Sequence, residues 1–238
     1  MADPGGAYFH DIGATPRALQ QGAGGVVVAS PYTGPAGDGG AAWFGLGSAA
    51  NYTDADLALA LPLSLECWFW LHHLQAAAVG FMSVSDGVTT LELGLDATLN
   101  AKGFASGGAA AAVAVTTRQQ WHHLVLTNTA GAAVLYLDGN NVAAPAAAAI
   151  GAWSPGFLVG GGGNPSAPLR LANAAIAEVA VYNAALTGGQ VNAHFAAATN
   201  AAQRPSFKGF GTFSTSTGGV VVNTDDTAAI LASVRKTY

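Results

Sequence analysis

The sequence predicts an all-β fold, an antiparallel two-sheet sandwich of the jelly-roll type. Short segments rich in β-branched and aromatic side chains alternate with clusters of Gly, Asn, Asp and Pro along nearly the whole chain, and this rhythm is typical of sandwiches and barrels. Helical patterns are rare and short. A length of 238 residues suits one large β domain with appendages, or two small domains.

Composition excludes several classes of protein. The formal net charge is −5 and charged residues make up 9% of the chain, and no Lys/Arg run is present to displace counterions from phosphates, so we expect no nucleic-acid partner. No basic segment followed by an apolar one opens the chain, so no signal peptide is visible. The apolar tracts are too short to cross a bilayer. The one cysteine, Cys67, lies in an apolar run that predicts burial.

Nine segments have the clearest strand character. They are Val26–Ala29, Ala41–Leu46, Leu63–Leu71, Val79–Ser85, Thr89–Leu95, Trp121–Thr127, Ala133–Leu137, Gly156–Val159 and Ala175–Tyr182. The segment Leu63–Leu71 is the most informative, because successive side chains of a strand point to opposite faces of the sheet. One face holds Leu63, Leu65, Cys67, Phe69 and Leu71, which we expect to line the core. The other holds Ser64, Glu66, Trp68 and Trp70, which predicts either a covering loop or subunit or a ligand platform.

Turns and helices complete the expected elements. Asp138-Gly139-Asn140-Asn141 follows a strand and contains residues that tolerate positive φ, which predicts a hairpin. Thr187–Ala197 predicts a helix or turn. Thr224–Lys236 carries acids in its first turn and Arg235 and Lys236 at its end, a charge order that complements a helix dipole and predicts a short C-terminal helix.

Four ordered segments resemble the laminin-G-like, concanavalin-A-like jelly-roll family. They are Ala41–Gly45 with Asn51-Tyr52, Leu63–Phe69, Trp121–Thr127 with Leu135–Gly139, and Ala175–Thr187 with Val191 and Phe195. The resemblance covers residues 23–198 and implies a concanavalin A-like sandwich. It leaves residues 1–22 as an N-terminal arm and residues 199–238 as a C-terminal extension ending in the short helix. The fold hosts many functions, so function has to be argued from residues.

Catalysis is not expected. Glycoside hydrolysis needs two nearby carboxylates, and the three glutamates, Glu66, Glu92 and Glu178, lack a suitably placed second acid. His72-His73 and His122-His123 are adjacent pairs whose members point to opposite faces of a strand, so neither pair can chelate one ion, and we expect structural histidines. Several members of the family hold calcium, for which Asp138 and Asn140 are the weak candidates. No other cofactor is expected.

The tails suggest a role in assembly. Phe207, Phe210 and Phe213 are spaced among Gly and Ser/Thr in a segment too small for its own core, so they must bury against something. The expected anchor residues are Phe207, Phe210, Phe213, Val221, Ile230 and Leu231.

The family resemblance extends to modules in virus particles. We therefore expect a non-catalytic virion structural protein, a capsid decoration or minor capsid or tail protein, whose partners are other virion proteins and copies of itself. The alternative is a carbohydrate-binding module that adheres to host glycans. Its candidate ligand-binding residues are Trp68, Trp70, Trp153 and Glu66.

Overall fold

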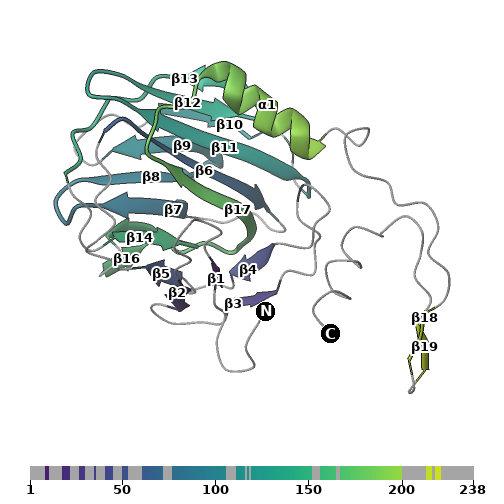
Figure 1. Ribbon diagram of the computed structural model, residues 1–238. Coiled ribbons are helices and arrows are strands. Elements are labelled where there is room, and N and C mark those ends of the chain that lie inside the picture. Colours follow the sequence, from purple (N-terminus) through teal and green to yellow (C-terminus); the bar gives the residue numbers. More distant parts are fainter. Residues whose placement is uncertain are drawn as a thin grey trace.

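Two antiparallel sheets stack face to face in the computed structural model (Figure 1). The described residues are 9–10, 18–21, 27–29, 35, 41–44, 50–52, 61–71, 77–105, 111–115, 117, 119–151, 156–164, 167–199, 213–215 and 218–220. Every strand pair in the two sheets is antiparallel. The predicted fold class, a concanavalin A-like sandwich, is confirmed.

The first sheet has eight strands in the order β1-β2-β5-β14-β7-β8-β9-β10. Their bounds are β1 Phe9–His10, β2 Ala18–Gln21, β5 Ala50–Tyr52, β14 Gly156–Val159, β7 Val79–Ser85, β8 Thr90–Leu95, β9 Asn100–Ala105 and β10 Ala111–Ala114. The second sheet has seven strands in the order β13-β12-β11-β6-β17-β4-β3. Their bounds are β13 Asn140–Ala143, β12 Ala133–Leu137, β11 Trp121–Asn128, β6 Leu63–Trp70, β17 Ala174–Tyr182, β4 Ala42–Phe44 and β3 Val27–Ala29.

The core lies between the sheets and is built by strand alternation. Leu65, Cys67 and Phe69 of β6 face Leu91 and Leu93 of β8 in one continuous cluster of buried side chains. Phe69 stacks on Phe81 of β7 with ring centroids 4.3 Å apart. The predicted burial of Cys67 is confirmed, and burial raises the pKa of its thiol, so this cysteine behaves as a small apolar residue.

The expected strands occur with ends shifted by a residue or two, whereas several Ala- and Gly-rich strands were not predicted. These are β9, β10, β15 (Gly162–Asn164) and β16 (Ala167–Leu169), where small residues give weak periodicity. The predicted hairpin joins β12 to β13, with Asp138 at φ 51° and Gly139 at φ 78°, as a tight turn with two positive φ angles requires.

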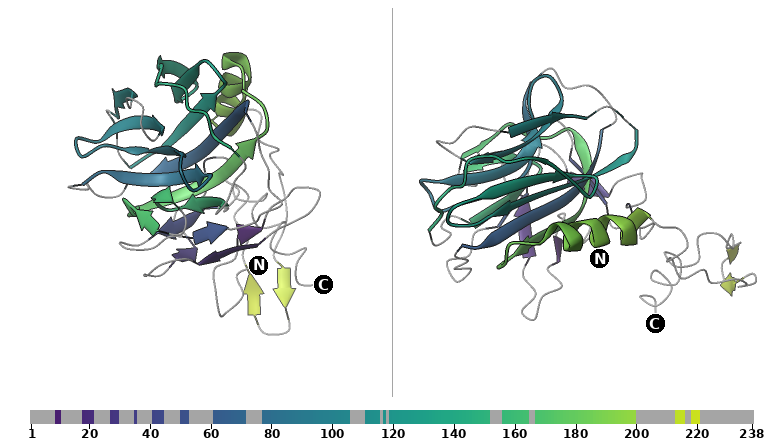
Figure 2. Two further views of the ribbon diagram at one scale, coloured as in Figure 1. Left: turned by 90° about the vertical axis from the view of Figure 1, so that its left-hand side faces the viewer. Right: turned by 90° about the horizontal axis from the view of Figure 1, so that it is seen from above.

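The helix α1, Gly188–Thr199, replaces the expected helix or turn and runs along the outer face of the seven-stranded sheet (Figure 2). Thr187 and Gln190 cap its start reciprocally. The Gln190 N–H donates to Thr187 Oγ1 at 3.3 Å and the Thr187 N–H donates to Gln190 Oε1 at 2.9 Å, which satisfies two otherwise unpaired donors. Within the described residues, no helix is long and apolar enough to cross a membrane.

Parts of both tails are described. Within residues 1–22, β1 pairs with β2, and β2 pairs with β5 at one edge of the eight-stranded sheet. In the C-terminal extension, β18 (Phe213–Thr215) pairs with β19 (Gly218–Val220) in a separate two-stranded sheet. The expected C-terminal helix and the anchor residues Phe207, Phe210, Val221, Ile230 and Leu231 lie outside the described residues.

Candidate functional site

The face of β6 predicted to be aromatic and polar is covered by α1. Trp68 is 1% exposed and its ring contacts those of His123 of β11, at 4.7 Å, and Phe195 of α1, at 5.7 Å, which also contact each other at 6.1 Å. The covering element thus comes from the same chain, which settles the choice between a covering loop and a second subunit at this position. Trp68 is consequently not accessible to a sugar, and we remove it from the candidate ligand-binding residues.

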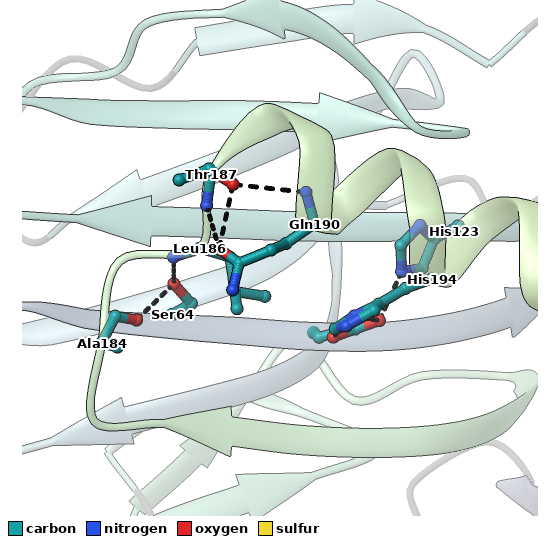
Figure 3. A network of polar contacts seen from close by, with 8 residues as sticks. Ser64, His123, Ala184, Leu186, Thr187, Gln190 and His194 are labelled. Carbon is teal, nitrogen blue, oxygen red and sulfur yellow. Dashed lines mark hydrogen bonds and ion pairs between the residues drawn. The ribbon is translucent and has the colours of Figure 1, made fainter.

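Glu66 is the centre of a buried polar cluster beneath α1 (Figure 3). His123 Nε2–H donates to Glu66 Oε1 at 2.7 Å, and His194 Nδ1–H approaches Oε2 at 3.1 Å. Burial by itself would raise the pKa of Glu66, but hydrogen bonds from His123 and Tyr182 and electrostatic interactions with His123 and His194 outweigh it, so the net pKa lies below its ordinary value. Glu66 is an ionised structural acceptor, not a surface ligand.

The loop before α1 is also fastened to β6. Ser64 Oγ donates to the carbonyl of Ala184 at 2.8 Å and accepts from the Leu186 N–H at 2.9 Å (Figure 3). On the outer face of β6, Ser64, Glu66 and Trp68 therefore all contact α1 or the loop before it.

A second buried carboxylate lies on the outer face of the other sheet. Glu92 of β8 is fully buried and accepts from Arg170 Nε at 2.9 Å, from Arg170 Nη2 at 2.5 Å and from the Gly163 N–H at 3.0 Å. The hydrogen bond to Glu92 raises the pKa of Arg170. A Cβ at Gly162 would lie 2.3 Å from Glu92 Cδ, so only a glycine allows the backbone of β15 to lie this close to the Glu92 carboxylate.

The calcium candidates do not form a cation site. Asp138 Oδ1 accepts from the His123 N–H at 2.9 Å and Oδ2 pairs with His122 Nδ1 at 2.8 Å, while the Asn140 amide donates to the Asp138 carbonyl at 3.0 Å. Among the described residues, no group of three or more His, Cys, Asp or Glu side chains is arranged to hold a metal ion. Asp138 and Asn140 therefore shape a turn and orient His122, and the residues do not fit calcium.

Trp70 keeps part of its surface open. It is half-buried at the end of β6 and is paired in register with Trp121 of β11, also half-buried. The two rings meet edge to face, with centroids 5.9 Å apart and planes at 67°. We define Trp70 and Trp121 as the tryptophan corner. Trp121 was not among the sequence candidates, although the Trp121–Thr127 strand was predicted, because its pairing with Trp70 depends on strand register.

The chain also matches known proteins over most of the sandwich. A family model described as "Concanavalin A-like lectin/glucanases superfamily" matches residues 44–192. The chain belongs to this family. The match lies inside the domain expected at residues 23–198, and a comparison with curated proteins finds no match.

Solved structures share the lectin-like fold at low sequence identity. Domain 4 of AbnA, an extracellular arabinanase from Geobacillus stearothermophilus, solved with arabinotriose, is 20% identical with a TM-score of 0.54, covering 74% of this chain and 87% of that one. A Trypanosoma rangeli sialidase is 17% identical with a TM-score of 0.52, covering 65% of this chain and 26% of that one. The receptor binding domain of botulinum neurotoxin C/D mosaic serotype is 10% identical with a TM-score of 0.52, and the match covers 75% of this chain and 46% of that one. The lectin-like chain thus spans about a quarter of the sialidase.

The described carboxylates of this lectin-like domain do not resemble a hydrolytic pair. Glu66 and Glu92 lie on the outer faces of different sheets, with the core between them, whereas glycosidases hold their two carboxylates within about 10 Å. A general acid also needs a raised pKa, and Glu66, Asp86 and Asp96 all have lowered ones, Asp96 to about 2 through hydrogen bonds from Asn100 and Thr98 that outweigh its burial.

Proposed function

We propose that this chain is a non-catalytic, lectin-like carbohydrate-recognition protein. The observation that carries the proposal is the tryptophan corner, where Trp70 and Trp121 remain half-buried, whereas Trp68 on the same sheet face is buried beneath α1. Indole rings that keep an apolar surface open are suited to stacking on the carbon face of a sugar ring. The arabinotriose bound to AbnA domain 4, which has the same fold, supports a saccharide as the ligand class.

The non-catalytic part of the proposal is supported by how the carboxylates are used. Glu66 is bonded to His194 of α1 and Glu92 to Arg170, so each buried carboxylate would have to leave its partner before it could act on a substrate, and leaving a buried charge unpaired costs about 3–5 kcal/mol. The test is a glycan array with the full chain and with Trp70→Ala. Binding of a sugar that the variant loses supports the proposal, and binding of no sugar contradicts it.

A second candidate function is the display of this domain on a virus particle, anchored through residues 199–238. The observation that favours it is that β18 pairs with β19 and with no described strand of either large sheet, while the sequence of the extension carries Phe207, Phe210 and Phe213. Deleting residues 200–238 is expected to abolish incorporation into particles. Retained incorporation contradicts the anchor. The two functions are compatible, since a displayed domain can bind host glycans.

A further inference from the structure

A hydroxyl, an imidazole and a carboxylate form a connected chain of contacts near the start of β11. Thr117 Oγ1 lies 3.1 Å from His122 Nε2, and His122 Nδ1 lies 2.8 Å from Asp138 Oδ2. Thr117 belongs to the loop before β11, His122 to β11 itself, and Asp138 to the β12–β13 turn. A nucleophile within hydrogen-bond reach of a base, where a third group orients the base, is the arrangement that activates a hydroxyl for covalent chemistry.

The contacts of His122 fix where its ring carries a proton. The Asp138 carboxylate can only accept, so His122 Nδ1 carries the hydrogen of that contact. In the neutral imidazole, Nε2 then has a free lone pair that can accept the hydroxyl proton of Thr117. The carbonyl oxygen of Thr117 lies 3.0 Å from the same nitrogen. Once Nε2 has taken a proton it can donate to this carbonyl, so both N–H groups of the resulting cation have acceptors.

The imidazole is held in its working orientation by the surrounding fold. His122 is 3% exposed, and its ring stacks on that of Phe69 with centroids 5.4 Å apart. Asp138 is fixed in turn, because its Oδ1 accepts from the His123 N–H at 2.9 Å. A base that is already positioned needs no rearrangement before it reacts, which is a large part of what makes such groups effective.

The threonine, in contrast to the imidazole, is exposed and therefore open to a reagent in solution. Its loop is fastened to β6, because the Gln119 N–H donates to the carbonyl of Leu71 at 3.2 Å. Gln119 has a φ of +57°, a strained conformation of the kind that clusters at functional sites. Gln120 Nε2 donates to Thr117 Oγ1 at 2.6 Å, and this bond would stabilise the negative charge that grows on the oxygen as its proton leaves.

We propose that Thr117 is an acylation site, which accepts an acyl group from an activated donor such as a thioester or an aryl ester. Thr117 Oγ1 attacks the acyl carbon while its proton passes to His122 Nε2. The bond from that carbon to the leaving group then breaks, and the leaving thiol or phenol takes the proton from His122. The product is an ester on Thr117, and no oxidant or reductant is consumed. This single modification of the chain goes beyond the proposed carbohydrate recognition and does not depend on it.

The test incubates the folded full chain with p-nitrophenyl acetate, quenches with acid and measures acetylation residue by residue by peptide mass spectrometry. Thr98 is the internal control. It is also exposed, and its Oγ1 also receives an amide hydrogen bond, from Asn100, and contacts a carboxylate, that of Asp96, but no described imidazole bonds it. General base catalysis contributes about 10²–10⁴-fold, so Thr117 should be acetylated at least about a hundredfold faster than Thr98.

Variants and unfolding assign the cause of any difference. Thr117→Val removes the hydroxyl at nearly constant size and should abolish acetylation at this position, whereas Thr117→Ser should retain it. His122→Gln should slow acetylation of Thr117 to the rate of Thr98. Unfolding the parent chain in urea should do the same without a substitution, which covers the case in which His122→Gln does not fold.

Two results would overturn the proposal. One is acetylation of Thr117 in the folded parent protein no faster than that of Thr98. The other is fast acetylation of Thr117 that persists in urea or in folded His122→Gln, because the imidazole would then not be its cause.

Discussion

At the scale of single residues, the molecule uses its buried charges to hold elements in place. Glu66 ties α1 to the seven-stranded sheet, and Glu92 ties the β15–β16 hairpin and Arg170 to the eight-stranded sheet. Each carboxylate sits on the outside of its sheet and is covered by a later segment of the chain. Both are therefore sensitive to the loss of their partners, because an uncompensated buried charge is costly.

Replacing Glu66 by glutamine should destabilise the protein at neutral pH and much less in acid. The amide lacks the negative charge that His123 and His194 contact, so we expect a loss of about 2 kcal/mol in the free energy of unfolding at pH 7. Because the native pKa of Glu66 is lowered, its contribution is present above the unfolded-state pKa, about 4.3, and is lost as the pH falls through the native pKa.

Urea unfolding at pH 7, 5 and 3.5 checks this prediction. The difference between the parent protein and Glu66→Gln should shrink at the lowest pH. Glu178→Gln, at an exposed position on the adjacent strand β17, is the control and should have a small effect. An equal difference at all three pH values would contradict the role of the Glu66 charge.

Replacing Arg170 by methionine should destabilise the protein by about 3–5 kcal/mol, because Glu92 would remain buried without its guanidinium partner. The double variant Arg170→Met, Glu92→Gln removes the buried charge as well and should recover part of the loss. Denaturant unfolding of both variants measures this coupling. If the double variant is no more stable than the single one, the ion pair is not the source of the effect.

At the scale of elements, α1 depends on its contacts more than on its own sequence. It begins with Gly188-Gly189 and has no acid in its first turn or base in its last, so intrinsic propensity and dipole interactions contribute little. The helix is stabilised instead by the Thr187–Gln190 cap and by the packing of Val191, Phe195 and Ala198 on the sheet.

Thr187→Ala should remove the helix cap and cost about 1 kcal/mol, the usual effect of losing an N-cap hydroxyl. Thr187→Ser retains the hydroxyl and should cost much less. Hydrogen exchange of the α1 amides is the direct measurement, and faster exchange confined to Thr187→Ala is the expected result. Equal exchange in both variants would mean that the cap does not hold the helix.

The two faces of β6 could be predicted from the sequence, whereas the segments that cover the buried carboxylates could not. Alternation in β6 placed Leu65 and Phe69 in the core and Glu66 and Trp68 on the opposite face, as observed. The segment that covers that face could not be identified from the sequence, because the contact between His194 and Glu66 joins residues 128 positions apart and leaves no local periodic pattern. The Arg170 partner of Glu92, 78 positions away, escaped prediction for the same reason.

At the scale of the whole molecule, the core is closed by residues up to the end of α1. The main cluster extends from Phe44 to Ile176, and α1 contributes to the two smaller ones. The C-terminal hairpin β18–β19 shares no strand pairing with the sheets. Among the residues that the structure describes, the core clusters thus draw on none beyond Ala198.

A chain ending at Thr199 should therefore unfold in a single cooperative transition, with a melting temperature within a few degrees of that of the full chain. Calorimetry of the two proteins checks this. A large drop in melting temperature, or a broad transition, would show that the extension contributes to the core.

The position of α1 after all the strands it covers has a consequence for synthesis. β6 and β11 leave the ribosome well before residues 188–199 do, at about 5–20 residues per second. During that interval Trp68, Val125 and Tyr136 lack the helix that covers them in the folded protein. An exposed apolar surface of this kind favours chaperone binding and self-association. Both are expected to decline once α1 has been synthesised and packs on the sheet.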